Sequence, residues 1–223
     1  MFTVHCFWRI ICAMALFQKR PTVTSSAPAY TIGGGKTYLI IGLGNPEAKY
    51  GDNRHNIGFA TLDHFARQND FPDWTEKKDL KGWLASADIA GNRVILGKPM
   101  TYMNLSGEAA LAVQHFYRIY NKDTLAVYDE LAIPFGQLRT RLGGTDAGHN
   151  GVKSLIEHLG EDFGRLRIGV GPLPAGKDAA AYVLQKFSQA EQAKLPLILR
   201  EANAMITEFI ASGDLPHDTR NIL

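Results

Sequence analysis

Three loops of this sequence carry asparagine and histidine side chains directly after apolar stretches. The loop at residues 42–56 contains Asn45 and His55, a later loop contains Asn104, and a third contains Asn150. In open α/β sheets, ligands bind in loops at the carboxyl ends of the strands. The three loops are therefore expected to meet at one edge of a sheet and to form a site there.

These residue types suit the hydrolysis of an uncharged acyl bond. A histidine can take a proton from water near neutral pH, and such general base catalysis contributes about 10²–10⁴-fold. A carboxylate on the other ring nitrogen fixes the tautomer and stabilises the protonated ring, while an amide NH₂ group can bind an oxyanion or a substrate carbonyl. His55 is accordingly the predicted base and Asn45 a positioning group. Asp129, which follows the apolar run 124–128, is the predicted carboxylate.

Asparagine also has a simpler use, since it caps helices and closes turns without taking part in any reaction. Two of the loops contain His-Asn followed closely by glycine. That recurrence favours a shared site, but the residues alone leave both interpretations open.

Other common sites fit the sequence poorly. Glycines at 42 and 44 suggest a dinucleotide-binding turn, but Glu47 stands where its third glycine belongs. The Gly-rich loop 143–151 lacks the adjacent Lys-Ser/Thr of a phosphate-binding loop, and no histidine lies in a HExxH or Cys/His arrangement. No GxSxG nucleophile motif is present. The sequence therefore predicts no metal, no cofactor and no serine nucleophile.

The hydrophobic periodicity predicts the elements that hold these loops. Strands are expected at residues 38–43, 124–128, 136–141 and 166–170, with a hairpin formed by 83–89 and 93–96. Helices are expected at residues 56–70, 106–119, 151–158, 179–187 and 191–211. This alternation predicts an α/β fold: a single domain with one mixed, largely parallel, twisted sheet flanked by helices on both faces.

Some residues have predicted places within these helices. Asn56 is expected to cap the first helix, and Pro196 to kink or break the last one. The inward-facing residues expected on the second helix are Ala109, Val113, Phe116 and Tyr117.

The chain has 223 residues, 45% hydrophobic and 21% charged, which fits one globular domain with its own core. We predict an extension at residues 1–37, either disordered or a targeting segment, and a domain at residues 38–223. The apolar tract 7–17 is too short to span a bilayer. No membrane partner is expected, and the predicted compartment is the cytoplasm, with organellar import through the extension as the alternative.

The net charge of +2 conceals an uneven distribution. Residues 1–37 contain four of the 24 basic residues and none of the 22 acidic ones, so the remainder has 20 basic and 22 acidic residues. Such a domain binds nucleic acid only through a local patch. The densest basic group in the domain comprises Arg139, Arg141, Lys153, Arg165 and Arg167.

Five segments occur in the order and spacing of one known family. They read GLGNPEAKYGDNRHNIGF, KPMTYMNLSG, DELAIPFGQLRTRLGG, AGHNG and RLRIGVG. From about Tyr38 to the C-terminus, the chain resembles bacterial-type peptidyl-tRNA hydrolase. The resemblance implies a monomeric enzyme that cleaves the ester between a peptide and the 3′ end of tRNA, which recycles tRNA from prematurely released translation products. It implies no cofactor, because an ester has a good leaving group.

The resemblance also implies roles for individual positions. His55 matches the catalytic base and Asp129 its support. The positions matching those that bind and orient the peptide or the tRNA end, with their neighbours, are Asn45, Asn104, Asn150, Met103, Tyr50 and His149. The tRNA-contacting basic positions match Arg141, Arg167 and Lys153. Recognition of peptide main-chain amides would make the enzyme indifferent to side chains.

Three places depart from the family pattern. Glu47 stands where glycine is usual, Asn53 where threonine is common, and Thr145-Asp146-Ala147 replaces a Ser-x-Gly loop. Glu47 and Asp146 add negative charge near an RNA path. The alternative function is a non-catalytic RNA-binding relative of the same fold, which the intact set of catalytic residues argues against.

Overall fold

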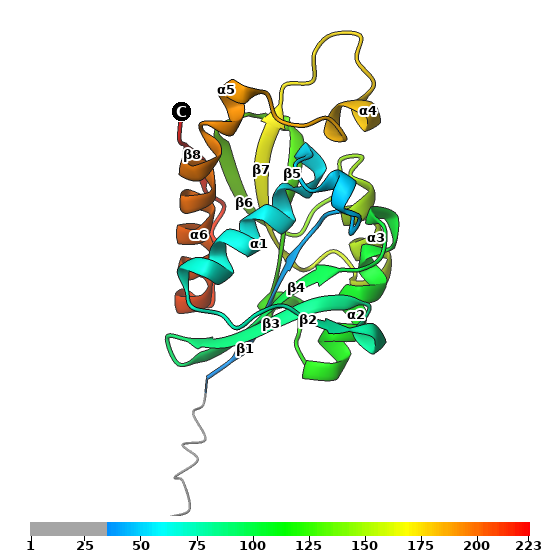
Figure 1. Cartoon of the computed structure of the whole chain (residues 1–223). Helices are drawn as coiled ribbons and strands as arrows, with labels where there is room; N and C mark the ends of the chain where they lie inside the picture. The colour runs from blue at the N-terminus through cyan, green and yellow to red at the C-terminus, as the bar shows by residue number, and fades with distance from the viewer. Residues whose placement is uncertain (1–34) are drawn as a thin grey trace, which may run out of the picture. The chain divides into compact units, whose positions relative to one another are not determined.

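The fold is built on one eight-stranded mixed sheet with the strand order β2-β3-β4-β1-β5-β7-β6-β8. The structure, a computed structural model, describes residues 35–223 (Figure 1). The extension predicted at residues 1–37 therefore lies, up to residue 34, outside the described residues. The strands are β1 (Thr37–Gly42), β2 (Thr75–Lys77), β3 (Gly82–Ile89), β4 (Asn92–Pro99), β5 (Thr124–Pro134), β6 (Gln137–Leu142), β7 (Gly164–Gly171) and β8 (Thr219–Asn221).

The four central strands, β4, β1, β5 and β7, run parallel, and the outer strands pair antiparallel. Parallel strands covered on both faces are near-continuous apolar runs. Leu39, Ile40 and Ile41 of β1 follow this rule, since each is at most 1% exposed. The predicted α/β fold class is confirmed, including the hairpin of β3 and β4.

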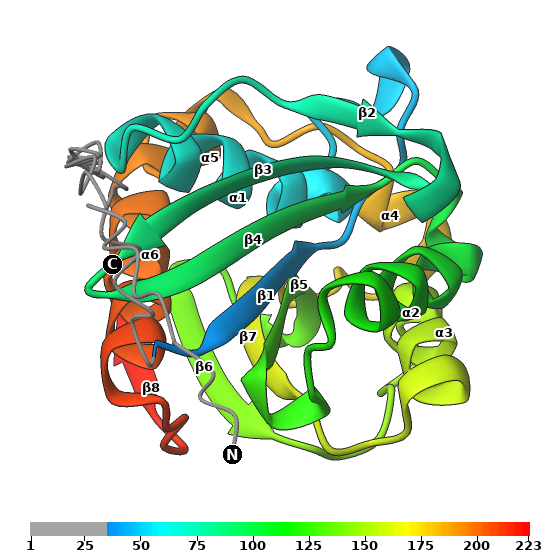
Figure 2. The ribbon, with the colours of Figure 1, turned by 90° about the horizontal axis from the view of Figure 1, so that it is seen from below.

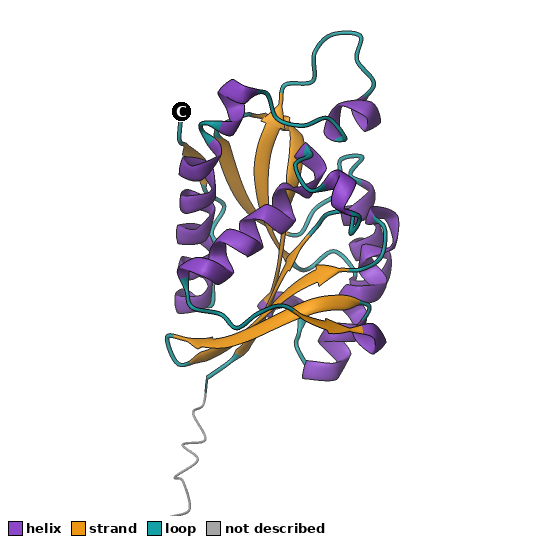
Figure 3. Ribbon diagram, in the orientation of Figure 1, coloured by secondary structure: helices purple, strands orange, loops and turns teal. Residues whose placement is uncertain are grey.

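Helices cover both faces of the sheet (Figure 3). The α-helices are α1 (Ile57–Gln68), α2 (Ser106–Tyr117), α3 (Asn150–Leu159), α4 (Ala179–Val183), α5 (Gln189–Gln192) and α6 (Leu195–Ser212). Helices α1 and α6 lie on one face, and α2 and α3 on the other (Figure 2). Alternate residues of β1 enter the two cores, because Ile40 packs in the cluster of Phe65 on α1 and Leu39 in that of Val113 on α2.

The connections change direction between the neighbouring strands β1 and β4. The chain leaves β1 through α1 on one face and reaches β5 from α2 on the other face. The two loops at the carboxyl ends of these neighbouring strands thus leave on opposite faces of the sheet. Such a switch in direction is where open α/β sheets bind ligands.

Several sequence-based expectations about the elements were wrong. Strand β5 continues to Pro134, so Asp129 lies inside the strand and not after it. Phe116 is 66% exposed and does not face the core. The helix expected over 179–187 ends at Val183, and Pro196 lies in the first turn of α6, where proline is tolerated, and not at a kink.

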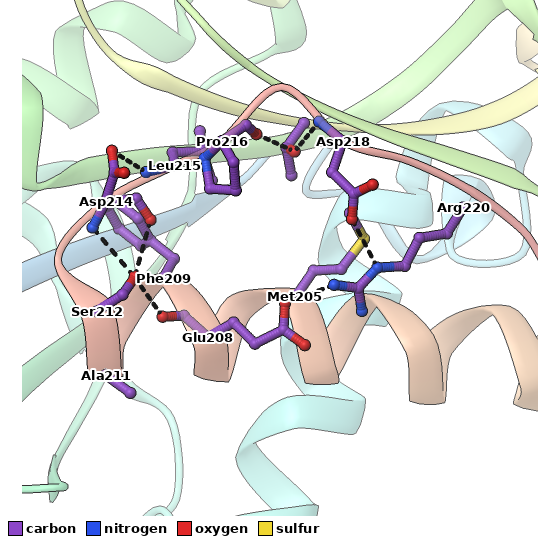
Figure 4. A pocket seen from close by; sticks show the side chains of 11 residues that line it. Met205, Glu208, Phe209, Ala211, Ser212, Asp214, Leu215, Pro216, Asp218 and Arg220 are labelled. Carbon is purple, nitrogen blue, oxygen red and sulfur yellow. Dashed lines mark hydrogen bonds and ion pairs between the residues drawn. The ribbon is translucent and has the colours of Figure 1, made fainter.

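Arg220 of the edge strand β8 joins the sheet to α6 (Figure 4). Its guanidinium contacts Glu208 and Glu201 of α6 and also Asp218. These hydrogen bonds, the one to Glu208 foremost, raise the pKa of Arg220. A cavity of about 580 Å³ lies between α6 and this segment. It contains none of the predicted site residues.

Candidate active site

The predicted loops meet at one cavity of about 810 Å³ at the carboxyl edge of the parallel strands. Its lining comes from the loops after β1 and β4, from β5, from the loop before α3, and from α4. The predicted site residues among the lining are Asn45, His55, Met103, Asn104, Asp129, His149 and Asn150. The cavity thus joins a histidine–carboxylate group to several primary amides.

Two histidines share one carboxylate oxygen in this cavity. The Nδ1 atom of His55 lies 2.8 Å, and the Nε2 atom of His149 3.1 Å, from Oδ1 of Asp129. The Asp129 side chain is only 2% exposed. Burial alone would raise the pKa of Asp129, but the two histidines more than offset it and hold that pKa well below its usual range. Asp129 is therefore a carboxylate at neutral pH.

The hydrogen bonds fix the ring tautomers. Nδ1 of His149 accepts from the backbone N–H groups of Gly151 and Val152, at 3.1 and 3.2 Å, so it carries no proton and Nε2–H donates to Asp129. Because Asp129 is ionised, His55 donates its Nδ1–H to the same oxygen. Nε2 of His55 is left with a free lone pair beside the cavity, which is the arrangement that a general base requires.

Backbone packing explains why Asp129 meets His55. Strand β1 pairs with β5 only as far as Gly42 opposite Val127, whereas β5 continues. The chain then returns through η2 (Arg54–Asn56), and α1 begins directly against the strands. A Cβ atom on Gly58 would lie 2.3 Å from the carbonyl oxygen of Val127, so only glycine permits this approach.

Glycine follows the second His-Asn pair for a similar reason, close packing against a neighbouring segment. A Cβ atom on Gly151 would lie 2.4 Å from Sδ of Met103. Helix α3 can therefore begin close to the loop after β4, with His149 as its N-cap. The repeated pattern of His, Asn and Gly thus places a histidine where a helix starts against its neighbours.

Asn45 is held by groups on both sides. Its Oδ1 accepts from the backbone N–H of Met103 at 2.9 Å, which identifies that atom as oxygen and leaves the NH₂ group as the donor beside the cavity. The side chain of Asn56 bonds to both the N–H and the C=O of Asn45, each at 2.9 Å. Asn56 stands at the predicted N-cap position of α1, but its side chain makes no capping hydrogen bond and braces the loop instead.

The loop that carries His149 does not reach the site in the expected way. Strand β6 is antiparallel to β7 and ends at Leu142, level with Leu125 near the start of β5. The loop must therefore run back along the sheet to bring His149 to Asp129. Arg165, 1% exposed, donates to the carbonyl oxygens of residues 144 and 145 and anchors this return.

Arg54 anchors the loop that carries His55, and no local sequence pattern predicts this role. Its Nη2 donates to both carboxylate oxygens of Glu191, at 2.9 and 2.7 Å, and its Nη1 donates to the carbonyl oxygens of Gln185 and Lys186. The Arg54 side chain is 6% exposed and its guanidinium lies 4.5 Å from the ring centroid of Tyr182. Arg54 precedes His55 directly, so this clamp fixes the backbone of the histidine.

Replacing Glu191 by glutamine is expected to lower the free energy of unfolding by about 2 kcal/mol, because it leaves the charge of Arg54 buried without a counterion. It should also lower kcat more than it raises KM, since η2 loses its anchor. Chemical denaturation and steady-state kinetics measure both effects. Glu208→Gln is the matched control, since its side chain is 60% exposed and its loss should cost about 1 kcal/mol or less and spare kcat. Equal effects of the two variants would contradict this role.

The remaining predicted residues lie outside the cavity lining. Tyr50 belongs to η1 (Ala48–Tyr50), and the ammonium of Lys49 lies 4.8 Å from its ring centroid. Arg141 and Lys153 are exposed and Arg167 is half-buried. Arg141 and Arg167 lie on one face of β6 and β7, because they stand opposite Arg165 and Arg139 in an antiparallel pair. Arg165 itself is engaged with the 143–149 loop and cannot serve phosphate.

His55, Asp129 and His149 are also of the residue types that bind metals, and their ligand atoms lie within 4.8 Å of one another. Their geometry is that of hydrogen bonds, however. Both histidines donate a hydrogen bond to the same oxygen of Asp129, and both ring nitrogens of His149 take part in hydrogen bonds.

Fold and cavity together define an α/β protein with a hydrogen-bonded histidine–carboxylate pair in a cavity at the carboxyl edge of parallel strands. A family model described as peptidyl-tRNA hydrolase matches residues 39–221. The chain belongs to the peptidyl-tRNA hydrolase family. The resemblance inferred from its five sequence segments is thereby confirmed.

Relatives and solved structures agree with this assignment. Peptidyl-tRNA hydrolases of Synechocystis sp. and Exiguobacterium sibiricum are 47% and 46% identical over 174 and 172 residues, which covers 78% and 77% of this chain and 87% and 92% of those proteins. The crystal structure of peptidyl-tRNA hydrolase from Acinetobacter baumannii is similar with a TM-score of 0.74 and 33% identity, over 79% of this chain and 89% of that chain.

Proposed function

We propose that this protein hydrolyses the ester that joins a peptide to the 3′ end of tRNA and so returns tRNA to translation. The observation that carries the proposal is the hydrogen-bonded pair of His55 and Asp129 in an amide-lined cavity, in a chain of this family. Neither a nucleophilic side chain nor a cofactor is needed, because water can attack an ester directly.

In the proposed mechanism, His55 Nε2 removes a proton from water as the water oxygen bonds to the ester carbonyl carbon. Asp129 stabilises the imidazolium that forms, and the NH₂ group of Asn45 donates to the developing oxyanion. The tetrahedral intermediate then expels the ribose oxygen. That oxygen takes the proton from Nε2, which leaves a free peptide acid, a free tRNA hydroxyl and neutral His55.

The other amides are proposed to hold the peptide main chain. Asn104 and Asn150 are exposed and line the cavity from opposite loops. Amide groups can pair with peptide N–H and C=O groups whatever the side chains are. Met103 and Tyr50 support this region, and His149 acts by positioning Asp129 and helix α3. This arrangement favours peptidyl- over aminoacyl-tRNA, whose free amine lacks the second carbonyl.

The tRNA is proposed to lie along the basic side of the site. Arg141, Lys153 and Arg167 are within reach of phosphates on the β6, β7 and α3 side. The rest of the described domain has more acidic than basic residues, so this patch supplies most of the attraction for RNA.

Arg141→Ala is expected to raise KM and to lower the slope of log Kd against log salt by about 0.7–0.9, the contribution of one phosphate contact. Filter binding or fluorescence anisotropy over a salt series measures the slope. Arg200→Ala on α6 removes the same charge from an exposed position on the other face and should leave the slope unchanged. An unchanged slope for Arg141→Ala would remove it from the phosphate patch.

A single-turnover assay on N-acetyl-aminoacyl-tRNA tests the function itself. Release of the acyl-amino acid by the purified protein is expected, with the unacylated aminoacyl-tRNA cleaved far more slowly. Tight RNA binding without release would instead identify a non-catalytic RNA-binding relative.

We propose that the enzyme acts as a monomer in the cytoplasm. All groups assigned to the reaction come from one chain, which supports the monomer. Among the described residues, no helix has the length and apolar character needed to span a bilayer.

A further inference from the structure

The cavity that contains His55 and Asp129 is called the reaction cavity below. A second cavity adjoins it on the side of β3 and β4. It has a volume of about 340 Å³ and shares Asn45 with the reaction cavity. Phe59 of α1, Trp74 and Trp83 of β3 form its aromatic walls. We refer to it as the tryptophan pocket.

The charges inside the tryptophan pocket are already satisfied. Nζ of Lys98 lies 2.7 Å from Oδ1 of Asp63 and 4.1 Å from the ring centroid of Trp74. The Lys98 side chain is 13% exposed and stands directly opposite Trp83 in the hairpin. The pocket therefore presents aromatic surface and a neutralised ammonium, which suit an apolar or aromatic group.

One hydrogen bond marks the boundary between the two cavities. Tyr102 lines the reaction cavity, and its hydroxyl donates to Oε1 of Glu47, at 2.6 Å, on the rim of the tryptophan pocket. Lys49 contacts the other carboxylate oxygen of Glu47 at 2.7 Å. These two contacts, the one from Lys49 first, lower the pKa of Glu47. Asn45 and the hydrogen-bonded pair of Tyr102 and Glu47 therefore lie between the reaction cavity and the tryptophan pocket.

The strand order tells which part of the substrate lies on this side. His55 and Asp129 lie where β1 and β5 part, and the basic residues lie beyond them on β6 and β7. The tryptophan pocket lies in the opposite direction, over β4 and β3. If phosphates occupy the basic side of the ester, the peptide leaves on the side of the pocket.

We propose that the tryptophan pocket binds a side chain of the peptide, upstream of the residue that carries the ester, and prefers large apolar or aromatic side chains. This inference rests on the proposed function. The amides of the reaction cavity accept any main chain, and the pocket adds a preference to that recognition. Acidic side chains are disfavoured at the same position, because the aromatic walls would desolvate their charge and Lys98 is already paired with Asp63.

The test compares tRNAs that carry N-acetyl-X-alanine, with X as phenylalanine, glycine or aspartate, and N-acetyl-alanine as the reference without X. Wild-type kcat/KM is expected to be roughly tenfold higher for phenylalanine than for glycine, as for partial burial of one large side chain, and lowest for aspartate. Trp83→Ala should remove the preference for phenylalanine and leave the reference substrate unaffected.

Trp83→Leu, which fills more of the space, keeps the test valid if the alanine variant does not fold, and it should weaken the preference. Phe116→Ala removes an exposed aromatic ring far along α2 and should preserve it. Equal wild-type rates for phenylalanine and glycine, or a preference that survives both Trp83 variants, would overturn the inference. Failure of the wild type to cleave the reference substrate would instead refute the proposed function.

Discussion

Replacement of His55 by alanine is expected to lower kcat by about 10²–10⁴-fold, the contribution of a general base. The reason is the geometry of its ring, since Nδ1 is bonded to Asp129 and Nε2 alone faces the cavity. Affinity for tRNA should change little, because the residues proposed to bind phosphate, Arg141, Lys153 and Arg167, lie on other elements. Single-turnover kinetics at saturating enzyme and equilibrium binding to an uncleavable peptidyl-tRNA analogue measure the two quantities separately.

His115→Ala provides a matched control, because His115 is exposed on α2 and does not line the reaction cavity. It should retain wild-type turnover. A His55 variant that loses binding in proportion to turnover would show that His55 holds the substrate and is not the base.

Replacement of Asp129 by asparagine is expected to lower kcat by about 10²–10⁴-fold as well. The neutral amide no longer stabilises the imidazolium of His55. If its NH₂ group turns toward His55, it also forces the ring proton onto Nε2, which abolishes the base. Steady-state kinetics on N-acetyl-aminoacyl-tRNA, with His115→Ala as the unaffected control, measure this loss. Retention of more than about a tenth of kcat would contradict the role of Asp129.

The same substitution has a predicted pH signature in stability. The pKa of Asp129 is lower in the folded protein than its unfolded value of about 3.9, so the carboxylate stabilises the fold above that pH. This contribution is lost as the pH falls below about 4, toward the folded-state pKa. The stability difference between wild type and Asp129→Asn, measured by thermal unfolding, should therefore shrink from pH 7 to pH 3. A difference that is independent of pH would contradict the lowered pKa.

Much of this site follows from local sequence rules. Loops after apolar runs placed Asn45, His55 and Asn104 at one sheet edge, because parallel strands share that edge. Asp129 lies at the site for another reason, because β5 extends beyond the end of its pairing with β1. His149 arrives through a loop that runs back from the far edge. Hydrophobic periodicity predicts neither the position of Asp129 nor that of His149, because both depend on which strands become neighbours.

Residues that act over long sequence distances were the hardest to interpret. Arg165 and Arg167 are two residues apart on β7, a spacing that predicts two side chains on one face, both available to bind phosphate. Arg165 is nevertheless buried and donates to carbonyl groups. Arg54 meets Glu191, which is 137 residues away, and no local pattern links them. Glu47 seemed to add repulsion for RNA, whereas the structure pairs its carboxylate with Lys49. Tertiary contacts decide whether a charged side chain is free.

The solvent isotope effect on single-turnover hydrolysis shows whether His55 removes a proton from the attacking water. N-acetyl-aminoacyl-tRNA is cleaved by saturating enzyme in H₂O and in D₂O, on the flat part of each pH–rate profile. We predict slower cleavage by the wild type in D₂O, and loss of that difference from the residual rate of His55→Ala. Equal wild-type rates in the two solvents, or the full isotope effect retained in His55→Ala, would contradict this role of His55.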